Sequence, residues 1–494
     1  MIVANVSTNL ITNLYVCKDN NNRSSFQYKY LGISGRTSSS IGLWLAALIP
    51  LACFPGFYSL YIQCNDSSSI LSIFAYSGKS NVGISTLYIL YDLYTKKSKS
   101  SGNQDFKTSL FRYNIHRWLP VIVSFMILGF FYKCDNVVVY ICAIICCLLQ
   151  ENLTKWIFKN FSDSFTIGEG LLVGQAASLI ISLSLKNLTA ILFVSCFGYI
   201  LWRWRRKFGA FLFLSFLTVM SLTGIFISSF LLDEWTYEWL IRLFSSPTRI
   251  ALVGWWLNVF VIMMITTFVS QRYPYVPQTV LRKIFHILMV FIMVPGIIKD
   301  PSLTYLAATG ATIFFLLLEI VRVSKINPFS SLLNSLFSNF LDEKDQGSLV
   351  LSHIYLLAGL TLPLWLYPCD FVYTEPASNN SASAVNNAQF CILPLLAGIL
   401  SVGIGDSAAS IGGTYIGKHR FPGTKKSVEG SICNILSQTL FICCIIQMGP
   451  VKLIWNVWPK LFVAVVLNAF VEAFTDQVDN IVLPLLLYTP LMDS

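Results

Sequence analysis

The residues best suited to chemistry lie together in the C-terminal part of the chain, where an apolar run contains Asp406 near its end and a basic loop at 414–430 follows. A carboxylate near the end of an apolar segment is costly to place in a membrane, so it is a candidate functional group. The small residues around Asp406 allow close approach of backbones or of a ligand. The loop supplies glycines, positive charges and hydroxyls, which are the groups that a polyphosphate site needs.

Two familiar nucleotide-binding patterns in this stretch are excluded by their context. Gly412–Lys418 has the spacing of a phosphate-binding P-loop, but His419 stands where magnesium coordination needs Ser or Thr. The preceding element is a predicted membrane span and not a buried parallel strand. The run from Gly403 to Ala408 imitates a dinucleotide fingerprint without the strand–helix–strand context that the fingerprint requires.

Taken as a whole, this stretch resembles the CTP-binding region of the polyprenol kinase family, which includes dolichol and phytol kinases. The matching residues are GDSAAS at 405–410, the pair Gly417-Lys418 and above all PGTKKSVEG at 422–430. The resemblance continues over residues 472–484, which are similar to the family's closing E…DN…P signature.

Two further elements upstream extend the resemblance. Residues 282–286 are similar to the family's RKxxH element, and Glu319 with Arg322 is similar to its ExxR pair. The resemblance therefore covers residues 280–490, and the N-terminal half matches only as a run of hydrophobic helices.

The resemblance implies CTP-dependent phosphorylation of dolichol to dolichyl phosphate, the lipid carrier for protein glycosylation. It places the protein in the endoplasmic reticulum membrane with its site facing the cytosol. CTP is the expected phosphoryl donor, and Mg²⁺ or a similar divalent cation is the expected metal. The expected partners are the membrane-embedded polyprenol and the lipid bilayer, without nucleic acid.

The same resemblance, read with the chemistry of phosphoryl transfer, assigns the site residues. The expected catalytic residues are Asp406, Glu472, Asp479, Lys283 and His286, with Asp406 and Asp479 as metal ligands. The expected nucleotide-binding residues are Tyr415, Gly417, Lys418, Arg420, Pro422, Gly423, Thr424, Lys425, Lys426, Ser427, Glu429 and Gly430. The lysines would hold phosphates, and the carboxylates would bind the metal or receive the proton of the acceptor hydroxyl. The residues alone leave open which carboxylate has which role.

Other activities remain open at this point. Within the enzymes they are a kinase acting on phytol, farnesol or diacylglycerol, and a cytidylyltransferase that uses CTP. Outside the enzymes, a secondary transporter also uses broken helices and an intramembrane carboxylate.

The elements that must position these residues are membrane helices. Of the 494 residues, 55% are hydrophobic and 12% are charged, against about 25% charged in a soluble domain. This composition excludes a soluble globular protein. The thirteen cysteines follow no metal or disulfide pattern, and several lie inside apolar runs as packing residues. Residues 1–36 are polar and lack the charge and apolar core of a cleavable signal peptide.

The apolar runs predict an all-α, polytopic protein with about fifteen transmembrane helices. The predicted spans are 41–63, 69–92, 118–133, 136–151, 169–186, 188–203, 209–232, 248–270, 281–298, 302–321, 349–368, 390–412, 431–448, 453–471 and 481–492. We divide the chain into a polar cytosolic segment (1–40), an N-terminal transmembrane scaffold (41–270) and a C-terminal catalytic membrane domain (271–494).

The basic residues predict the orientation of these spans. The clusters at 96–107, 203–207, 282–283, 322–325 and 418–426 account for the excess of positive charge between spans. An even number of predicted spans separates each cluster from the next, so all five lie on one side. By the positive-inside rule this side is the cytosol. The loop at 369–389, with a glycosylation sequon at Asn379, then lies on the opposite face.

Overall fold

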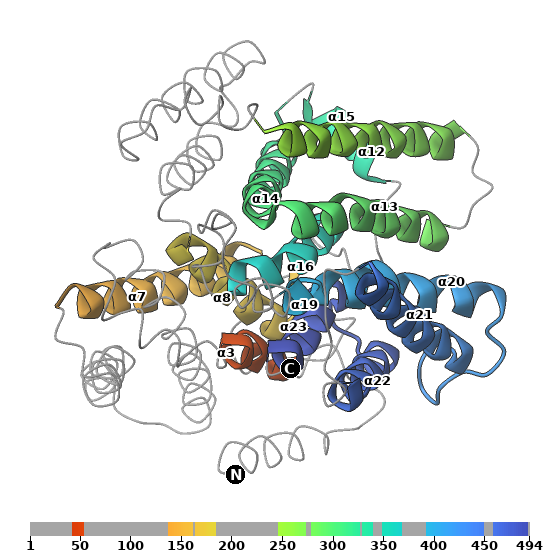
Figure 1. Ribbon diagram of the computed structural model, residues 1–494. Coiled ribbons are helices and arrows are strands. Elements are labelled where there is room, and N and C mark those ends of the chain that lie inside the picture. The colour runs from red at the N-terminus through yellow and green to blue at the C-terminus, as the bar shows by residue number, and fades with distance from the viewer. Residues whose placement is uncertain are drawn as a thin grey trace.

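The structure is a computed structural model that describes residues 42–53, 137–161, 164–183, 246–272, 278–326, 329–338, 348–367, 392–448 and 458–492. All the regular secondary structure in these ranges is helical, which confirms the all-α prediction for this part of the chain (Figure 1). The predicted spans 69–92, 118–133, 188–203 and 209–232 lie outside it.

The helices follow one another along the chain in a simple order. They are η1 (Leu43–Ala47), α3 (Leu48–Cys53), α7 (Val137–Asn160), α8 (Ile167–Leu183), α12 (Pro247–Arg272), α13 (Gln278–Lys299), α14 (Pro301–Val323), α15 (Phe329–Ser338), α16 (Ser352–Leu366), α19 (Ile392–Leu395), η5 (Ile399–Asp406), α20 (Ser407–Tyr415), α21 (Val428–Gln447), α22 (Trp458–Phe474) and α23 (Asp479–Met492).

Four of the described helices are long and apolar enough to cross a membrane. They comprise Pro247–Ser270, Thr279–Lys299, Pro301–Val323 and Val428–Gln447. The outer helix α12 exposes large apolar side chains such as Leu257, Phe260 and Phe268. In a bilayer such a surface faces the acyl chains, so the described part is that of a multi-pass membrane protein.

The ends of several helices differ from the predicted spans for local reasons. The run at 136–151 continues as helix α7 to Asn160, since Glu151 is buried and forms an ion pair with Lys155 one turn later. The run at 390–412 is broken into α19, the π-helix η5 and α20. The short helix α15 was not predicted, because only one side of it is apolar.

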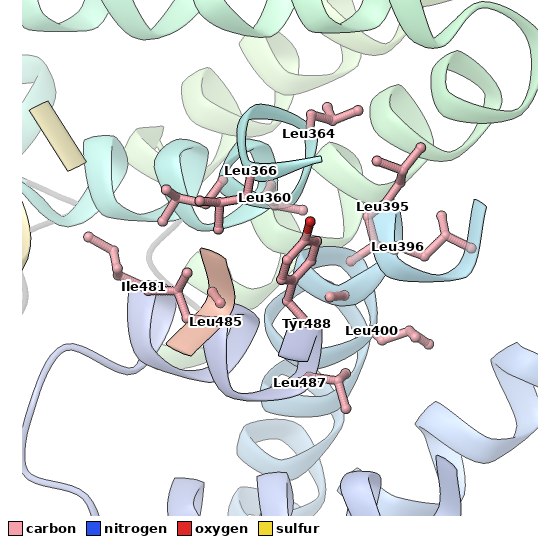
Figure 2. Close-up of a cluster of buried hydrophobic side chains, with 14 of the residues drawn as sticks. Leu360, Leu364, Leu366, Leu395, Leu396, Leu400, Ile481, Leu485, Leu487 and Tyr488 are labelled. Atoms are coloured by element: carbon pink, nitrogen blue, oxygen red, sulfur yellow. The ribbon is translucent and has the colours of Figure 1, made fainter. Parts of the chain in front are cut away.

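The centre of the bundle consists of two short helices. α16 has 15 residues and α23 has 14, so each is about 21–23 Å long, less than the bilayer core of about 30 Å. Their side chains are largely buried, and Figure 2 shows Leu360 of α16 near Tyr488 of α23. Gly359 allows this packing, because a Cβ there would overlap the carbonyl oxygen of Asn480.

The packing around this centre brings together helix ends that are distant in sequence. η5 packs against α13, α21, α22 and α23, while α3 packs against α23 and α8, and η1 packs against α8. As a result, the beginning of α13, the junction of η5 with α20, the beginning of α21 and the link between α22 and α23 surround one region. These are the elements that carry the candidate site residues.

Candidate active site

Asp406 is the last residue of the π-helix η5 and directly precedes α20. Its side chain is almost completely buried, with 1% of its surface exposed. A π-turn inside a helix is uncommon and is often found at functional sites. The local cause is the small-residue sequence before Asp406, in which Gly403 and Gly405 lie against neighbouring side chains of α13 and α21.

Lys283 and His286 of α13 reach Asp406 from the other side. They lie three residues apart, so they share one face of the helix. The Lys283 ammonium forms an ion pair with Oδ2 of Asp406, and Nδ1 of His286 lies 3.8 Å from the same oxygen. Both side chains are at least nine-tenths buried. Because a buried charge is costly without a partner, each of these two side chains provides the partner that the other needs.

The basic loop is a narrow turn between α20 and α21. The backbone N–H of Phe421 donates to the carbonyl of Lys426 (3.1 Å), and the N–H of Val428 donates to that of His419 (2.8 Å). Gly423 lies at the tip with φ of +75°, a value that favours glycine. These bonds hold the loop residues in one defined conformation at the end of α20.

Two side chains close the base of this loop. The hydroxyl of Ser427 accepts from the N–H of Gly430 (3.1 Å) and so caps the N-terminus of α21. Glu429 accepts from the N–H of His419 (3.1 Å) and contacts the His419 ring nitrogen Nδ1 at 2.6 Å. Glu429, which is expected to bind the nucleotide, therefore also has a structural role in shaping the loop.

Lys426 connects the loop to the end of α22. Its ammonium forms an ion pair with Glu472, whose side chain is 1% exposed. Burial lowers the pKa of Lys426, but the carboxylates of Glu472, Asp406 and Asp479 outweigh it and raise the pKa above its ordinary value. The Phe421 ring packs on Phe474 of α22 at a centroid distance of 5.2 Å, which fastens the loop to the same helix.

Asp479 begins α23, and its carboxylate accepts from the N–H of Asn480 (3.2 Å). Its charge acts on Asp406, Lys426 and His286, so it lies within electrostatic reach of all three. We call Lys283, His286, Asp406, Lys426, Glu472 and Asp479 the charge cluster. It contains the five residues expected to be catalytic, together with one of the three lysines of the loop.

The remaining predicted nucleotide-binding residues divide into two groups. The side chains of Tyr415, Lys418, Arg420, Pro422 and Lys425 are exposed on the outer surface of the loop, and their assignment to the nucleotide stays a prediction. Gly417, Gly430 and Gly423 have backbone roles: a Cβ on Gly430 would lie 2.7 Å from the carbonyl oxygen of Ala409, so this glycine allows α20 and α21 to pack closely. Thr424 donates to the carbonyl of Phe421 within the turn (3.4 Å).

The expected divalent cation can be compared with the side-chain groups that could act as its ligands. Within the described ranges, no group of three or more His, Cys, Asp or Glu side chains is arranged to hold a metal ion. Mg²⁺, however, is commonly held by one or two carboxylates together with substrate phosphates and water. Asp406 and Asp479 provide two carboxylates whose charges act on each other. Carboxylates of this kind are chemically suited to a magnesium ion.

The pair Glu319–Arg322 makes its contacts away from the charge cluster. The Arg322 guanidinium binds Glu319 and donates to the carbonyl oxygen of Ser348 (2.6 Å), while Glu319 accepts from the N–H of Val350 (2.7 Å). These bonds fasten the end of α14 to the segment before α16. The structure thus gives this pair a role in packing.

Sequence reasoning missed several buried polar residues near the cluster. Asn434 and Gln438 of α21 are fully buried and adjoin Gly405. Thr166 and Glu169 at the beginning of α8 are also buried, and they contact the link between α22 and α23. Polar residues four apart on an apolar helix, and the T-x-x-E capping pattern, are the signals that could have identified them.

Comparison with known proteins identifies similar sequences. Residues 160–381 match the family model described as dolichol kinase. This region includes Glu169, Lys283 and His286 and ends before Asp406. The chain is 36% identical over 262 residues to the dolichol kinases of Bos taurus and Homo sapiens, a match that covers 51% of this chain and 47% of each relative.

A more distant relative gives the same description. The chain is 30% identical over 266 residues to the dolichol kinase sec59 of Schizosaccharomyces pombe, covering 52% of this chain and 49% of the relative. The matched region thus spans about half the length of these curated relatives. No solved structure shows significant similarity to the chain.

Proposed function

We propose that this chain is a membrane-embedded kinase that transfers the terminal phosphoryl group of CTP to the hydroxyl of dolichol, giving dolichyl phosphate and CDP. The observation that carries the proposal is the charge cluster itself. One ion pair, Lys426–Glu472, joins α22 to a loop whose sequence resembles the CTP-binding region of polyprenol kinases, and the other, Lys283–Asp406, lies within electrostatic reach of Lys426. The similarity to proteins named dolichol kinase supports dolichol as the acceptor.

The two lysines have different parts in the proposed reaction. Phosphoryl transfer is promoted mainly by positioning and by positive charge around the transferred group. Lys426, protonated and joined to the loop, faces the phosphates of a nucleotide held there. Lys283 neutralises Asp406, so that a carboxylate can stay ionised in the buried part of the site. A divalent cation bound by Asp406 and Asp479 would supply further neutralisation of phosphate charge.

His286 is the residue we assign to receive the proton of the acceptor hydroxyl. Its Nδ1 has no hydrogen-bond partner among the described residues, although it is buried. It lies 3.8 Å from Oδ2 of Asp406, whose negative charge attracts a proton taken up by the ring. As the hydroxyl oxygen bonds to the terminal phosphorus, the bond to the CDP oxygen breaks and the proton moves to the histidine.

The lipid acceptor explains why this site is built between membrane helices. Lipid-facing side chains such as Leu436 and Leu440 of α21 and Leu467 of α22 lie on the outer surface of the helices that carry the cluster. A polyprenol can remain in the bilayer along such a surface while its hydroxyl approaches the cluster. The hydrocarbon chain then contributes position more than affinity, because it is already in an apolar environment.

The choice of CTP is the part of the proposal that one assay tests directly. The resemblance of PGTKKSVEG at 422–430 to the family's nucleotide-binding region leads us to expect faster turnover with CTP than with ATP at equal concentration. Purified protein is incubated with dolichol and either nucleotide labelled in its terminal phosphate, and labelled dolichyl phosphate is measured. Equal or faster transfer from ATP would contradict the choice of CTP. Release of pyrophosphate in place of CDP would indicate a cytidylyltransferase, and no lipid product at all would favour a transporter.

We further propose about fifteen transmembrane helices, with the charge cluster at the cytosolic face of the endoplasmic reticulum membrane. The crossing count predicts that the ends carrying Lys283, Lys426 and Glu472 lie on one side, and the ion pairs Lys283–Asp406 and Lys426–Glu472 support this prediction. The ion pair Arg249–Asp300 joins the beginning of α12 to the end of α13, the end that does not carry Lys283. This pair also agrees with the crossing count.

This orientation can be tested with glycosylation acceptor sites. An Asn-Ser-Thr segment inserted between Gly423 and Thr424 is expected to stay unmodified in microsomes, because it would face the cytosol. The tip of the loop has open space around Gly423, so the insertion should be tolerated. As a control, the same segment within 369–389 should be modified if it extends far enough from the bilayer. Glycosylation at the loop tip would place the cluster in the lumen and refute the orientation.

A further inference from the structure

The beginning of α8 is closed by a capping box made from Thr166 and Glu169. The N–H of Glu169 donates to the Thr166 hydroxyl oxygen (3.2 Å), and the N–H of Thr166 donates to Oε2 of Glu169 (3.0 Å). This reciprocal pair satisfies two N–H groups that a helix start otherwise leaves without partners. Such a motif needs no contact with any other part of the chain.

Both members of this box nevertheless bind a segment more than three hundred positions away in the sequence. The second carboxylate oxygen of Glu169, Oε1, accepts from the N–H of Val478 (3.2 Å), and the Thr166 hydroxyl donates to Oε1 of Gln477 (2.9 Å). Thr166, Glu169 and Gln477 are each no more than 2% exposed. These bonds are therefore shielded from water, and breaking one would leave a buried polar group without its partner.

The segment that they hold connects two members of the charge cluster. It runs from the end of α22, which carries Glu472, to the beginning of α23, which carries Asp479. Gln477 and Val478 are the last two residues before Asp479. The first described residue, Gly42, packs against the Gln477 side chain, and a Cβ at Gly42 would overlap it. The link is thus enclosed by segments from the N-terminal half of the chain.

We propose that Thr166 and Glu169 are positioning residues for Asp479: they fix the two residues before it and thereby set where its carboxylate stands relative to Asp406 and Lys426. The N-terminal half is then part of the active-site construction and not only a scaffold. The consequence for activity rests on the proposed kinase function, whereas the effect on the link itself can be measured independently.

The first measurement is hydrogen exchange in the full-length protein in detergent or nanodiscs. In the wild type the Val478 amide should exchange slowly, because it is buried and bonded to Glu169. Glu169→Gln keeps the size of the side chain but replaces two acceptor oxygens with one. In the wild type the N–H groups of Thr166 and Val478 each use a separate carboxylate oxygen. Exchange in peptides covering 476–482 should then become faster by about tenfold or more. Thr166→Val should also accelerate exchange there, and Thr166→Ser, which retains the hydroxyl, should not.

The second measurement is the divalent-cation requirement of dolichol phosphorylation. Loss of a residue that orients a metal ligand typically reduces metal affinity or activity by about 10- to 100-fold. We expect Glu169→Gln and Thr166→Val to raise the Mg²⁺ concentration for half-maximal activity by such a factor, with the KM for dolichol unchanged. A general loss of stability would reduce the amount of active protein without changing this concentration.

The control variant is Asp300→Ala. It removes the side-chain cap of α14, in which an Asp300 oxygen accepts from the N–H of Leu303 (2.8 Å). Within the described residues, this cap makes no contact with the link between α22 and α23. It should lower thermal stability and leave both the cation requirement and the exchange at 476–482 as in the wild type. Unchanged exchange at 476–482 in Glu169→Gln would overturn the proposal, and so would faster exchange with a wild-type cation requirement. If the wild type makes no dolichyl phosphate, the proposed function fails, and the exchange measurement alone decides whether the link is held as described.

Discussion

Lys283→Met is expected to destabilise the folded protein by about 3–5 kcal/mol and to remove nearly all of the proposed kinase activity. Methionine preserves much of the apolar stem of lysine but leaves the Asp406 carboxylate, 1% exposed, without the ammonium that it pairs with. Removing one partner of a buried ion pair has a cost of this size, because the other charge stays in a poorly hydrated place. Thermal unfolding of purified protein and the rate of dolichyl phosphate formation are the two measurements.

The double variant Lys283→Met/Asp406→Asn separates stability from chemistry. It removes both charges, so most of the lost stability should return, while the activity should stay absent because the site still needs the carboxylate. Arg249→Met is the matched control, since it breaks the more exposed Arg249–Asp300 pair at the other ends of the helices. It should cost about 0–1 kcal/mol and leave the activity unchanged. Wild-type turnover in the double variant would show that the Lys283–Asp406 pair serves folding alone.

Lys426→Met is expected to lower kcat by about 10²–10³-fold, as the loss of a charge directed at the transferred phosphate does in other enzymes. Its neighbour Lys425 has an exposed side chain, and Lys425→Met should lower kcat by less than about tenfold. The comparison is sharp because the two residues are adjacent in the same loop. Both variants are assayed at saturating CTP and normalised to folded protein measured by size-exclusion chromatography.

The physical reason for this difference is the surroundings of the two ammonium groups. That of Lys426 binds Glu472 and experiences the charges of Asp406 and Asp479, which raise its pKa and keep it protonated. Because the pKa is raised, the favourable interaction is complete at neutral pH and is lost only when the pH rises through that value. An equal loss of activity in both variants, or a larger one in Lys425→Met, would contradict the assignment of Lys426 to the cluster.

The positions of several spans could be predicted because the sequence marks their ends. The run predicted at 302–321 is α14 at Pro301–Val323. Asp300 caps the beginning of this helix, and the basic residue Arg322 lies in its last turn, where positive charge is favourable. The run at 431–448 is α21, which begins three residues earlier because Ser427 provides the cap. The break within 390–412 could not be predicted, since a π-turn depends on how η5 packs against its neighbours and not on its apolar pattern.

The members of the candidate site were predictable to a similar degree. Asp406 stands out because a carboxylate is rare inside an apolar segment and needs a reason to be there. Lys283 and His286 can be assigned only through the resemblance of residues 282–286 to the RKxxH element, since basic residues and His flank many membrane spans. The pairing of Lys426 and not Lys425 with Glu472 follows from the turn of the loop, which the composition of 414–430 does not reveal. Glu169 could not be assigned to the site from the sequence, because the capping pattern at the beginning of α8 is sufficient to account for a glutamate there. Its hydrogen bond to Val478 depends on the tertiary fold.

The central position of α23 has a consequence for how the protein is made. This helix packs against α16, α22, η5 and the early segment α3, yet it is the last of the described helices to leave the ribosome. At about 5–20 residues per second, the preceding 478 residues take about half a minute or more to synthesise. During that time the early helices lack the partner around which they pack. Biogenesis must therefore keep an incomplete bundle from premature association or degradation, and the charge cluster can assemble only after α23, the last described helix, has been made.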